Sequence, residues 1–332
     1  MTTIAPDLQG AEPNLSRHRL SPRDYLQRYG LLLAWAVVVI VFSLLRPETY
    51  GTLRNFQTIF SSQAVILTLA IGLMLPLIVG ELDLSLAGVL GLSNMLVGWL
   101  NVEMGWPIGA AVLAALAAGA FVGIVNSLLV VGLKLNSIVV TLGMGTLLAG
   151  ITVGIHNLPI GGVSPGLVSF IRFKPLGLQM SFYIALAIAA LAWYVLKYTP
   201  LGRHLYFVGD GPNVARLSGL RVDALRVGAF IVAGVIAAIA GVVLAGLLGS
   251  ADPNSGPSLL LPGLASVFLG ATAFMPGRYN AAGTLVAVYF LVSGISGLEQ
   301  LGYSGWVSSV FYGASLIIAV VLSRLAGNRS VA

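Results

Sequence analysis

The chain has 332 residues, of which 58% are hydrophobic and only 8% are charged. The surface of a soluble protein needs roughly a quarter of its residues charged, so this composition excludes a soluble globular protein and indicates a polytopic membrane protein. The absence of cysteine excludes disulfides and thiolate metal sites, and the net charge of +6 suggests nucleic-acid binding only until the cations are located along the chain.

The first 28 residues differ in composition from the apolar run that follows them. Residues 1–22 are polar, contain prolines and show no hydrophobic period, so they predict a largely disordered segment, and the tail ends in a basic patch of Arg17, Arg19, Arg23 and Arg28. The apolar run over residues 31–45 resembles a signal peptide, but Arg46 and Pro47 follow it directly, without a small-residue cleavage site. The sequence therefore favours a retained first membrane span.

Nine further apolar runs follow, each close to the about 20 residues that a helix needs to cross a bilayer. They cover residues 57–79, 84–101, 107–131, 137–155, 180–197, 227–248, 258–273, 281–298 and 306–323. The sequence therefore predicts an all-α fold with ten membrane spans. These spans form one transmembrane domain, residues 29–325, between an N-terminal tail (residues 1–28) and a C-terminal tail (residues 326–332).

The distribution of Lys and Arg predicts the orientation of the spans. Cations in short loops are retained on the cytoplasmic side of the membrane. With a cytoplasmic N-terminus, thirteen Lys and Arg residues fall in cytoplasmic segments and four in outer segments. Both termini and the connection over residues 199–226 are therefore predicted to be cytoplasmic, and the positive charge is explained by topology without any nucleic-acid partner.

The connection over residues 199–226 is the one long polar interruption among the apolar runs. Within it, Pro212 suits the first position of a helix, and Gly219 suits the left-handed stop after the last turn, so a helix of about two turns is predicted between them. A helix that short is marginal in water and needs packing against other elements. The segment is either a solvated loop or a docking helix for a soluble partner.

Two carboxylates, Glu81 and Asp83, lie between hydrophobic runs with almost no loop around them. Ionisable groups near membrane depth are costly and tend to face a cavity or one another, which suggests a broken or re-entrant segment. Alternatively, the segment is a tight cytoplasmic turn in which Asp83 caps the helix that begins near Leu86. The residues leave both interpretations open.

Other polar positions lie inside or beside the predicted spans. Asn126 and Thr141 either hydrogen-bond between helices or line a path for a hydroxylated solute. The rigid polar stretch over residues 252–258 is either a plain Pro/Gly turn or a part of the outer entrance. His156 has no second histidine nearby, so a metal site there is not expected.

Several catalytic and nucleotide-binding motifs are missing from the sequence. It contains no phosphate-binding loop, because none of its three lysines follows a glycine, and it contains no HExxH or GxSxG motif. The sequence therefore predicts a protein without catalytic residues or cofactors. If ATP drives its activity, a separate subunit must hydrolyse the nucleotide.

Three motifs resemble those of the ribose-type permease subunits of bacterial ATP-binding-cassette sugar importers, over about residues 30–325. The stretch Gly80–Ser85 is similar to the family's Gly-Gly-Ile-Asp-Leu-Ser element, and Ile138–Gly143 to its Ile-Val-Thr-Leu-Gly segment. The most specific match is the pair Gly202–Gly209 and Ala215–Leu220, whose spacing is that of the family. The resemblance implies a non-catalytic subunit of an importer for a monosaccharide or related polyol.

The resemblance also implies sites, partners and location. The residues at the positions of the ATPase-coupling element are Gly202, Arg203, Gly209, Asn213, Arg216, Ser218 and Gly219. The candidate residues of the translocation pathway, chosen for their polarity within or beside the spans and not implied by the resemblance, are Asp83, Ser85, Asn126 and Thr141. The expected partners are an ATP-binding-cassette ATPase, a periplasmic sugar-binding protein, a second permease copy and the lipid of the bacterial inner membrane.

The chain departs from the family pattern at three places. Glu81 stands where the family usually has a second glycine, Asn136–Ser137 replaces a common Pro-Pro or Val-Pro entry, and Met275–Arg278 replaces the usual Ser-Gly-Gly-Arg, so the particular sugar stays open. A proton-coupled secondary transporter that uses Glu81 or Asp83 is the first alternative. An intramembrane acid-pair hydrolase is the second, although two carboxylates two positions apart lie about 200° apart on a helix, which does not favour their convergence.

Overall fold

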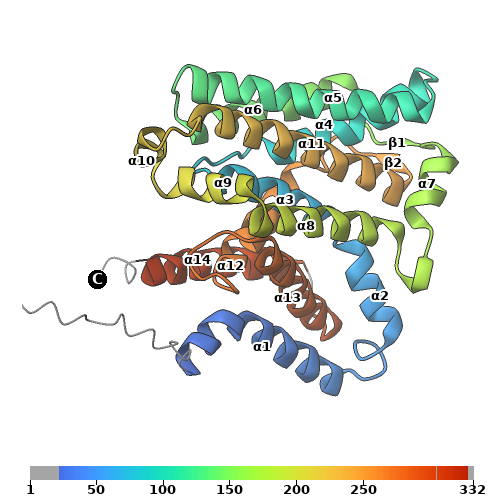
Figure 1. Cartoon of the computed structure of the whole chain (residues 1–332). Helices are drawn as coiled ribbons and strands as arrows, with labels where there is room; N and C mark the ends of the chain where they lie inside the picture. Colours follow the sequence, from blue (N-terminus) through green and yellow to red (C-terminus); the bar gives the residue numbers. More distant parts are fainter. Residues whose placement is uncertain (1–21, 304, 328–332) are drawn as a thin grey trace, which may run out of the picture.

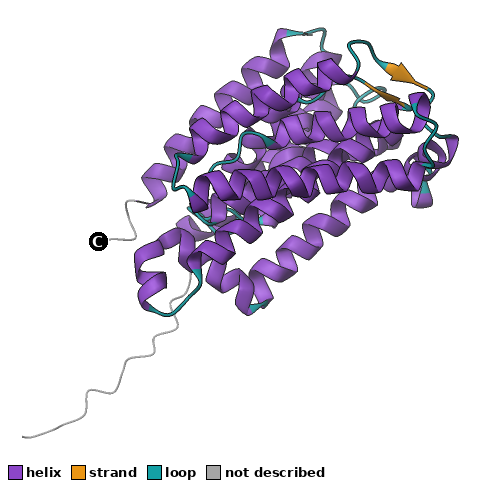
Figure 2. Ribbon diagram, turned by 90° about the horizontal axis from the view of Figure 1, so that it is seen from above, coloured by secondary structure: helices purple, strands orange, loops and turns teal. Residues whose placement is uncertain are grey.

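The structure of the protein is a computed structural model that describes residues 22–303 and 305–327. It is a bundle of helices, and its described part contains only one two-stranded pairing, β1 (Ile160–Gly161) with β2 (Ser250–Ala251) (Figures 1 and 2). The predicted all-α membrane fold is therefore confirmed. The predicted N-terminal tail lies mostly outside the described residues, but helix α1 begins at Pro22, within the stretch assigned to that tail.

The first half of the chain supplies the helices α1 (Pro22–Leu45), α2 (Leu53–Ser62), α3 (Ala64–Ile78), α4 (Leu86–Gly98), α5 (Ile108–Ser127) and α6 (Ser137–Ile155). Two of them continue into short π-helical segments, α4 into η1 (Trp99–Glu103) and α5 into η2 (Leu128–Gly132). The second half supplies α7 (Pro165–Arg172), η3 (Pro175–Gly177), α8 (Met180–Tyr198), α9 (Pro200–Asp210), α10 (Pro212–Leu217), α11 (Val222–Leu248), α12 (Pro257–Gly270), α13 (Ala281–Gln300) and α14 (Trp306–Gly327).

Each of the ten predicted apolar runs coincides with a helix or a pair of helices. Within residues 22–303 and 305–327, seven helices are long and apolar enough to cross a membrane, and the pair α2–α3, bent by 41°, makes eight. The remaining two, α12 and the apolar part of α14, are shorter. Helix α12 has 14 residues, which gives about 21 Å of helix against a hydrocarbon core of about 30 Å. The count of ten spans stays a prediction.

Helix α11 packs against α3, α4 and α5, in the half of the bundle that also holds α6 (Figure 1). Its contact with α5 depends on glycines. A Cβ atom added to Gly234 would overlap the carbonyl oxygen of Gly119, and a Cβ atom on Gly119 would overlap the carbonyl oxygen of Gly234. Because neither residue has a side chain, the two backbones touch directly, as small residues permit in membrane bundles.

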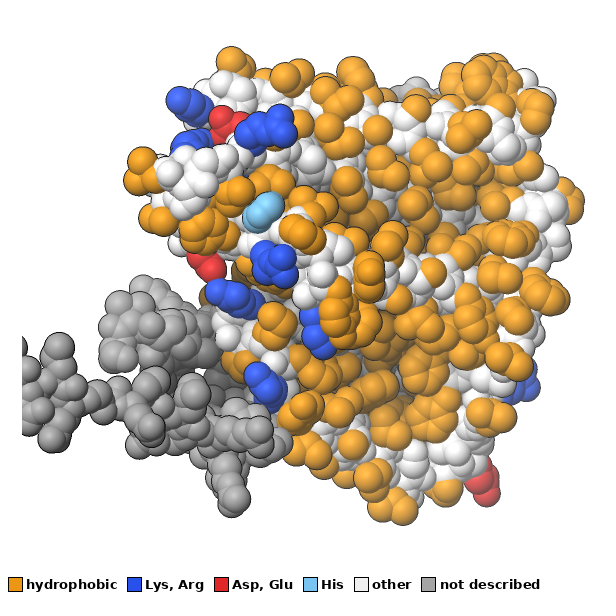
Figure 3. Space-filling view, in the orientation of Figure 1, with side chains coloured by type: hydrophobic (Ala, Val, Ile, Leu, Met, Phe, Trp, Pro, Cys, Tyr) orange, Lys and Arg blue, Asp and Glu red, His pale blue; other side chains and the backbone are white. Residues whose placement is uncertain are grey.

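The two ends of the bundle differ in composition. Helices α9 and α10 lie at one end, and α7 and the β-strands lie at the opposite end (Figure 1). On the face shown in Figure 3, Lys and Arg side chains gather at the end with α9 and α10, whereas the sides of the bundle are mostly hydrophobic. The cations that the sequence analysis assigned to cytoplasmic segments therefore gather at the α9–α10 end, which is the end predicted to be cytoplasmic.

The connection between α8 and α11 contains more helix than the sequence predicts. The expected short helix is present as α10, and Gly219, with φ of +82°, ends it as predicted. Residues 200–210, interpreted from the sequence as a polar interruption, form the additional helix α9. Its start is defined locally, because Pro200 takes the first position and the Thr199 hydroxyl accepts the N–H of Gly202 at 3.3 Å.

Candidate functional site

Helices α9 and α10, with their flanking residues, form a segment over residues 199–221 that we term the α9–α10 arm. Its first contact is with the last turn of α8, where a Cβ atom added to Gly202 would overlap the carbonyl oxygen of Leu196. Leu205 and Val208 of α9 are also buried. The first helix of the arm is therefore packed firmly onto the bundle and is not a solvated loop.

The far end of α9 contacts the end of α3. A Cβ atom added to Gly209 would overlap the carbonyl oxygen of Ile78, the last residue of α3. Ile78 directly precedes the non-helical segment over residues 79–85, which we term the acidic loop because it carries Glu81 and Asp83. Gly209 thus allows the arm to sit against the start of the acidic loop.

Helix α10 is the most exposed part of the arm. Ala215 is fully buried, but Val214 is 56% exposed and Leu217 is 89% exposed. The Arg216 guanidinium is tied back to Asp223, in the first turn of α11, with an N–O distance of 2.7 Å. A short helix that is anchored at its base and presents apolar side chains outward is suited to insertion into a complementary protein surface.

The seven residues assigned to coupling fall into two groups. Gly202 and Gly209 lie against the bundle and permit close backbone contacts. The others are exposed on α9, on α10 or just after α10; they are Arg203, Asn213, Arg216, Ser218 and Gly219. The structure therefore divides the predicted set into residues that fix the arm and residues that a partner could reach.

The four candidate pathway residues come together around the acidic loop. Asp83, Ser85 and Asn126 form one hydrogen-bonded group, in which the Ser85 hydroxyl donates to Asp83 Oδ1 at 2.6 Å and Asn126 Nδ2 donates to the Ser85 hydroxyl at 2.8 Å. Thr141 holds the adjacent backbone, because its hydroxyl accepts the N–H of Leu84 at 3.0 Å. These side chains are at most 1% exposed, so they form a closed polar cluster inside this chain.

The acidic loop combines features of both sequence interpretations. Its residues are non-helical, and Asp83 Oδ1 accepts the backbone N–H of Ser85 at 2.9 Å, immediately before α4 begins at Leu86. Asp83 therefore orders the turn before α4, but the predicted cap is not formed, because no side chain accepts an N–H from the first turn of that helix. Its carboxylate receives several donors, which offsets the cost of removing a charge from water.

Glu81 has a different partner from Asp83. Its carboxylate lies 3.3 Å from the guanidinium of Arg226, in the first turns of α11. The two acids thus point to separate partners and do not form the convergent pair that a hydrolase would need. Among the described residues there is also no group of three or more His, Asp or Glu side chains that could hold a metal ion.

Sequence reasoning missed a second set of contacts that fixes the arm. Asp210 pairs with Arg278 at 2.7 Å, and the Tyr206 hydroxyl donates to the carbonyl of Tyr279 at 2.7 Å. Burial raises the pKa of Tyr206 to about 12, so the hydroxyl stays protonated and remains a donor at neutral pH. These contacts join α9 to the connection between α12 and α13 across roughly seventy residues of sequence, which no local pattern reveals.

The comparisons with known proteins agree with this architecture. The family described as "Branched-chain amino acid transport system / permease component" matches residues 55–320. The D-allose transport system permease protein AlsC of Escherichia coli is 29% identical over 302 residues, covering 91% of this chain and 93% of that protein. No solved structure matches the chain.

Two further relatives have similar coverage. The ribose import permease protein RbsC of Bacillus subtilis is 32% identical over 302 residues, covering 90% of this chain and 93% of its own length. The autoinducer 2 import system permease protein LsrD of Photorhabdus laumondii is 30% identical over 307 residues, covering 89% of this chain and 91% of that protein. This chain therefore belongs to the permease-component family, as a ribose-type permease subunit of ATP-binding-cassette importers and not an enzyme.

Proposed function

We propose that this chain is the membrane-spanning subunit of an ATP-driven importer of a monosaccharide or related polyol in the bacterial inner membrane. The names of its relatives, which import ribose, D-allose or autoinducer 2, support this class of solute. Two permease copies enclose the pathway, a periplasmic binding protein delivers the solute, and a separate ATPase supplies the energy. Both termini and the α9–α10 arm face the cytoplasm.

The observation that carries this proposal is the exposure of α10. Val214 and Leu217 are large apolar side chains presented to solvent at the cation-rich end of the bundle, although Ala215 and the Arg216–Asp223 pair hold the helix in place. Such side chains are unfavourable in water unless a partner covers them. The partner in this proposal is the ATPase subunit, which receives α10 in a cleft of its surface.

The mechanism follows from the contacts of the arm. ATP shifts the assembly only because it binds one global state more tightly than the other, and the ATPase must then move the element that it holds. The arm is joined to α8 by Gly202, to α3 by Gly209, and to the α12–α13 connection by Asp210. Movement of α10 therefore reaches several membrane helices together.

Uptake by the reconstituted assembly tests the proposal. Vesicles that contain this chain, its ATPase and its binding protein should accumulate labelled ribose or allose only when ATP is supplied on the ATPase side. Accumulation that follows a pH gradient without any ATPase would contradict the proposal and would favour the proton-coupled alternative, with Glu81 or Asp83 as the relay.

Docking at α10 can be tested separately. Because the chain contains no cysteine, Leu217→Cys introduces a single thiol at the tip of α10. A thiol-to-amine cross-linker should join this variant to the ATPase subunit. The matched control is Leu158→Cys, which is also exposed but lies near β1 at the other end of the bundle, and should give no ATPase adduct. Equal cross-linking of the two variants would contradict docking at α10.

A further inference from the structure

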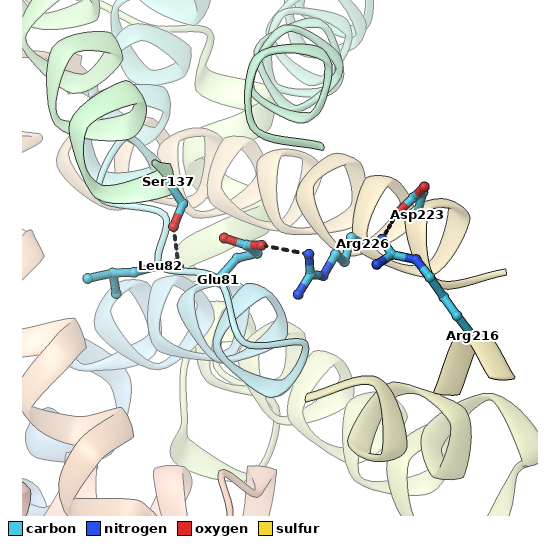
Figure 4. A network of polar contacts seen from close by, with 6 residues as sticks. All are labelled: Glu81, Leu82, Ser137, Arg216, Asp223 and Arg226. Carbon is cyan, nitrogen blue, oxygen red and sulfur yellow. Dashed lines mark hydrogen bonds and ion pairs between the residues drawn. The ribbon is translucent and has the colours of Figure 1, made fainter. Parts of the chain in front are cut away.

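Two ion pairs meet on the first turns of α11 (Figure 4). Asp223 pairs with Arg216 of α10 at 2.7 Å, and Arg226 pairs with Glu81 of the acidic loop at 3.3 Å. Asp223 and Arg226 are three positions apart on one helix, so they are neighbours on its surface. The start of α11 therefore stands between the exposed helix α10 and the buried loop that precedes α4.

The two pairs differ in their exposure to solvent. The side chains of Arg216 and Asp223 are 47% and 64% exposed, whereas those of Arg226 and Glu81 are only 20% and 13% exposed. Salt and water screen the outer pair, but they screen the inner pair much less. Loss of one inner partner would leave the other charge uncompensated in a mostly buried place, so each side chain strongly fixes the position of the other.

The acidic loop depends on such side-chain contacts for its position. Its first residues bond back to the last turn of α3, where the N–H of Glu81 donates to the carbonyl of Pro76 at 2.9 Å. Beyond Glu81, α6 holds the backbone, because the N–H of Leu82 donates to the Ser137 hydroxyl at 3.4 Å and the N–H of Leu84 donates to Thr141. Glu81 therefore lies in a loop that α6 holds on one side and α11 holds on the other (Figure 4). A shift of α11 relative to α6 would strain this loop directly.

We propose that the Glu81–Arg226 pair is a coupling strut, through which displacement of α10 and the start of α11 moves the acidic loop and its Asp83–Ser85–Asn126 cluster. The inference rests on the proposed function, because it assumes that an ATPase displaces α10. It assigns to Glu81 and Arg226 a positioning role that is distinct from binding the solute or the ATPase. The strut transmits force from α11, and the contact of Gly209 with Ile78 transmits it from α9.

The decisive variant replaces both charges at once, as Glu81→Gln with Arg226→Met. Removing both partners avoids an unpaired buried charge, so the variant should fold, insert and bind the ATPase like the parent chain. In vesicles with the ATPase and the binding protein, ATP hydrolysis should persist while the number of solute molecules imported per ATP falls by about fivefold or more, as expected for the loss of a typical coupling interaction. The matched control is Lys134→Met, which removes one exposed cation from the η2–α6 connection and should leave the ratio unchanged.

A reversed pair supplies the second measurement. Glu81→Arg alone should lower the import-to-hydrolysis ratio, and adding Arg226→Glu should restore at least part of it, because the attraction is re-formed with opposite polarity. Three outcomes would contradict the proposed strut. They are an unchanged number of solute molecules imported per ATP in the neutral double variant, failure of that variant to bind the ATPase, and absence of rescue by the reversed pair. Failure of the parent assembly to import solute with ATP would instead overturn the proposed function.

Discussion

The acidic loop and the α9–α10 arm are both polar interruptions between membrane helices, yet they treat their side chains in opposite ways. The acidic loop buries the carboxylate of Asp83 and the hydroxyl of Ser85 and pairs both within the chain, where the Ser85 hydroxyl also accepts an N–H from Asn126 of α5. The arm buries small and apolar residues at its base and leaves Val214 and Leu217 exposed at its tip. A segment whose polar groups are satisfied internally is complete in the isolated chain, whereas one that exposes large apolar side chains is complete only with a partner.

The largest expected effect comes from opening the polar cluster of the acidic loop. Asp83→Ala removes the acceptor for the Ser85 hydroxyl and N–H, and these buried donors would remain unpaired. We expect the free energy of unfolding to fall by about 3 kcal/mol, which thermal unfolding of the purified chain in detergent would measure.

The exposed carboxylate of Asp223 provides the control for this comparison. It is 64% exposed, so Asp223→Ala should change the stability by less than about 1 kcal/mol. Equal shifts for the two variants would mean that the cluster around Asp83 contributes no more to stability than a surface ion pair.

A smaller effect is expected where the arm meets α3. The added Cβ of Gly209→Ala would overlap the carbonyl of Ile78, so the variant should be less stable by about 1–3 kcal/mol. A Cβ atom added to Gly228, in α11, would meet no other atom within 4 Å. Gly228→Ala should therefore stabilise the helix by about 0.5–1 kcal/mol. Unfolding of both variants should give changes in the free energy of unfolding with opposite signs. A loss of stability in both variants, or a gain in both, would contradict the close contact between Gly209 and Ile78.

The smallest effect should follow from breaking the exposed ion pair of α10. Arg216→Met removes a half-exposed pair and should lower the free energy of unfolding by less than about 1 kcal/mol at low salt. The difference from the parent should vanish in 1 M NaCl, where the Debye length is about 3 Å. A large loss that persists at high salt would show that the arm depends on this pair as the acidic loop depends on its buried contacts.

The membrane fold follows from the sequence because hydrophobic runs of sufficient length must form helices in a bilayer. The ends of α10 were also predictable, since Pro212 and Gly219 have strong local preferences. The bend between α2 and α3 was not predicted, although Ser61, Ser62 and Gln63 interrupt the apolar run over residues 57–79 at the place where the helix breaks. The shortness of α12 and the helical state of α9 depend on tertiary packing.

The candidate site divides in the same way. Asp83, Ser85 and Thr141 lie in the family motifs, and Asn126 was identified as an isolated polar residue within a span. The hydrogen bonds from Asn126 to Ser85 and from Leu84 to Thr141 span 41 and 57 residues of sequence, so only the folded chain brings these residues together. Glu81 was recognised as unusual, whereas its partner Arg226 was counted only as a topogenic cation. Residues that act through long-range pairs carry no local signal of the partner that they meet.

The direct backbone contact between Gly119 and Gly234 has a consequence for how the subunit can change shape. Sliding between packed helices normally proceeds by repacking of the side chains between them, and at this crossing no side chain separates the backbone of α5 from that of α11. We therefore expect these two helices to move together. The movement that opens and closes the transporter is then expected at an interface between other helices of the bundle.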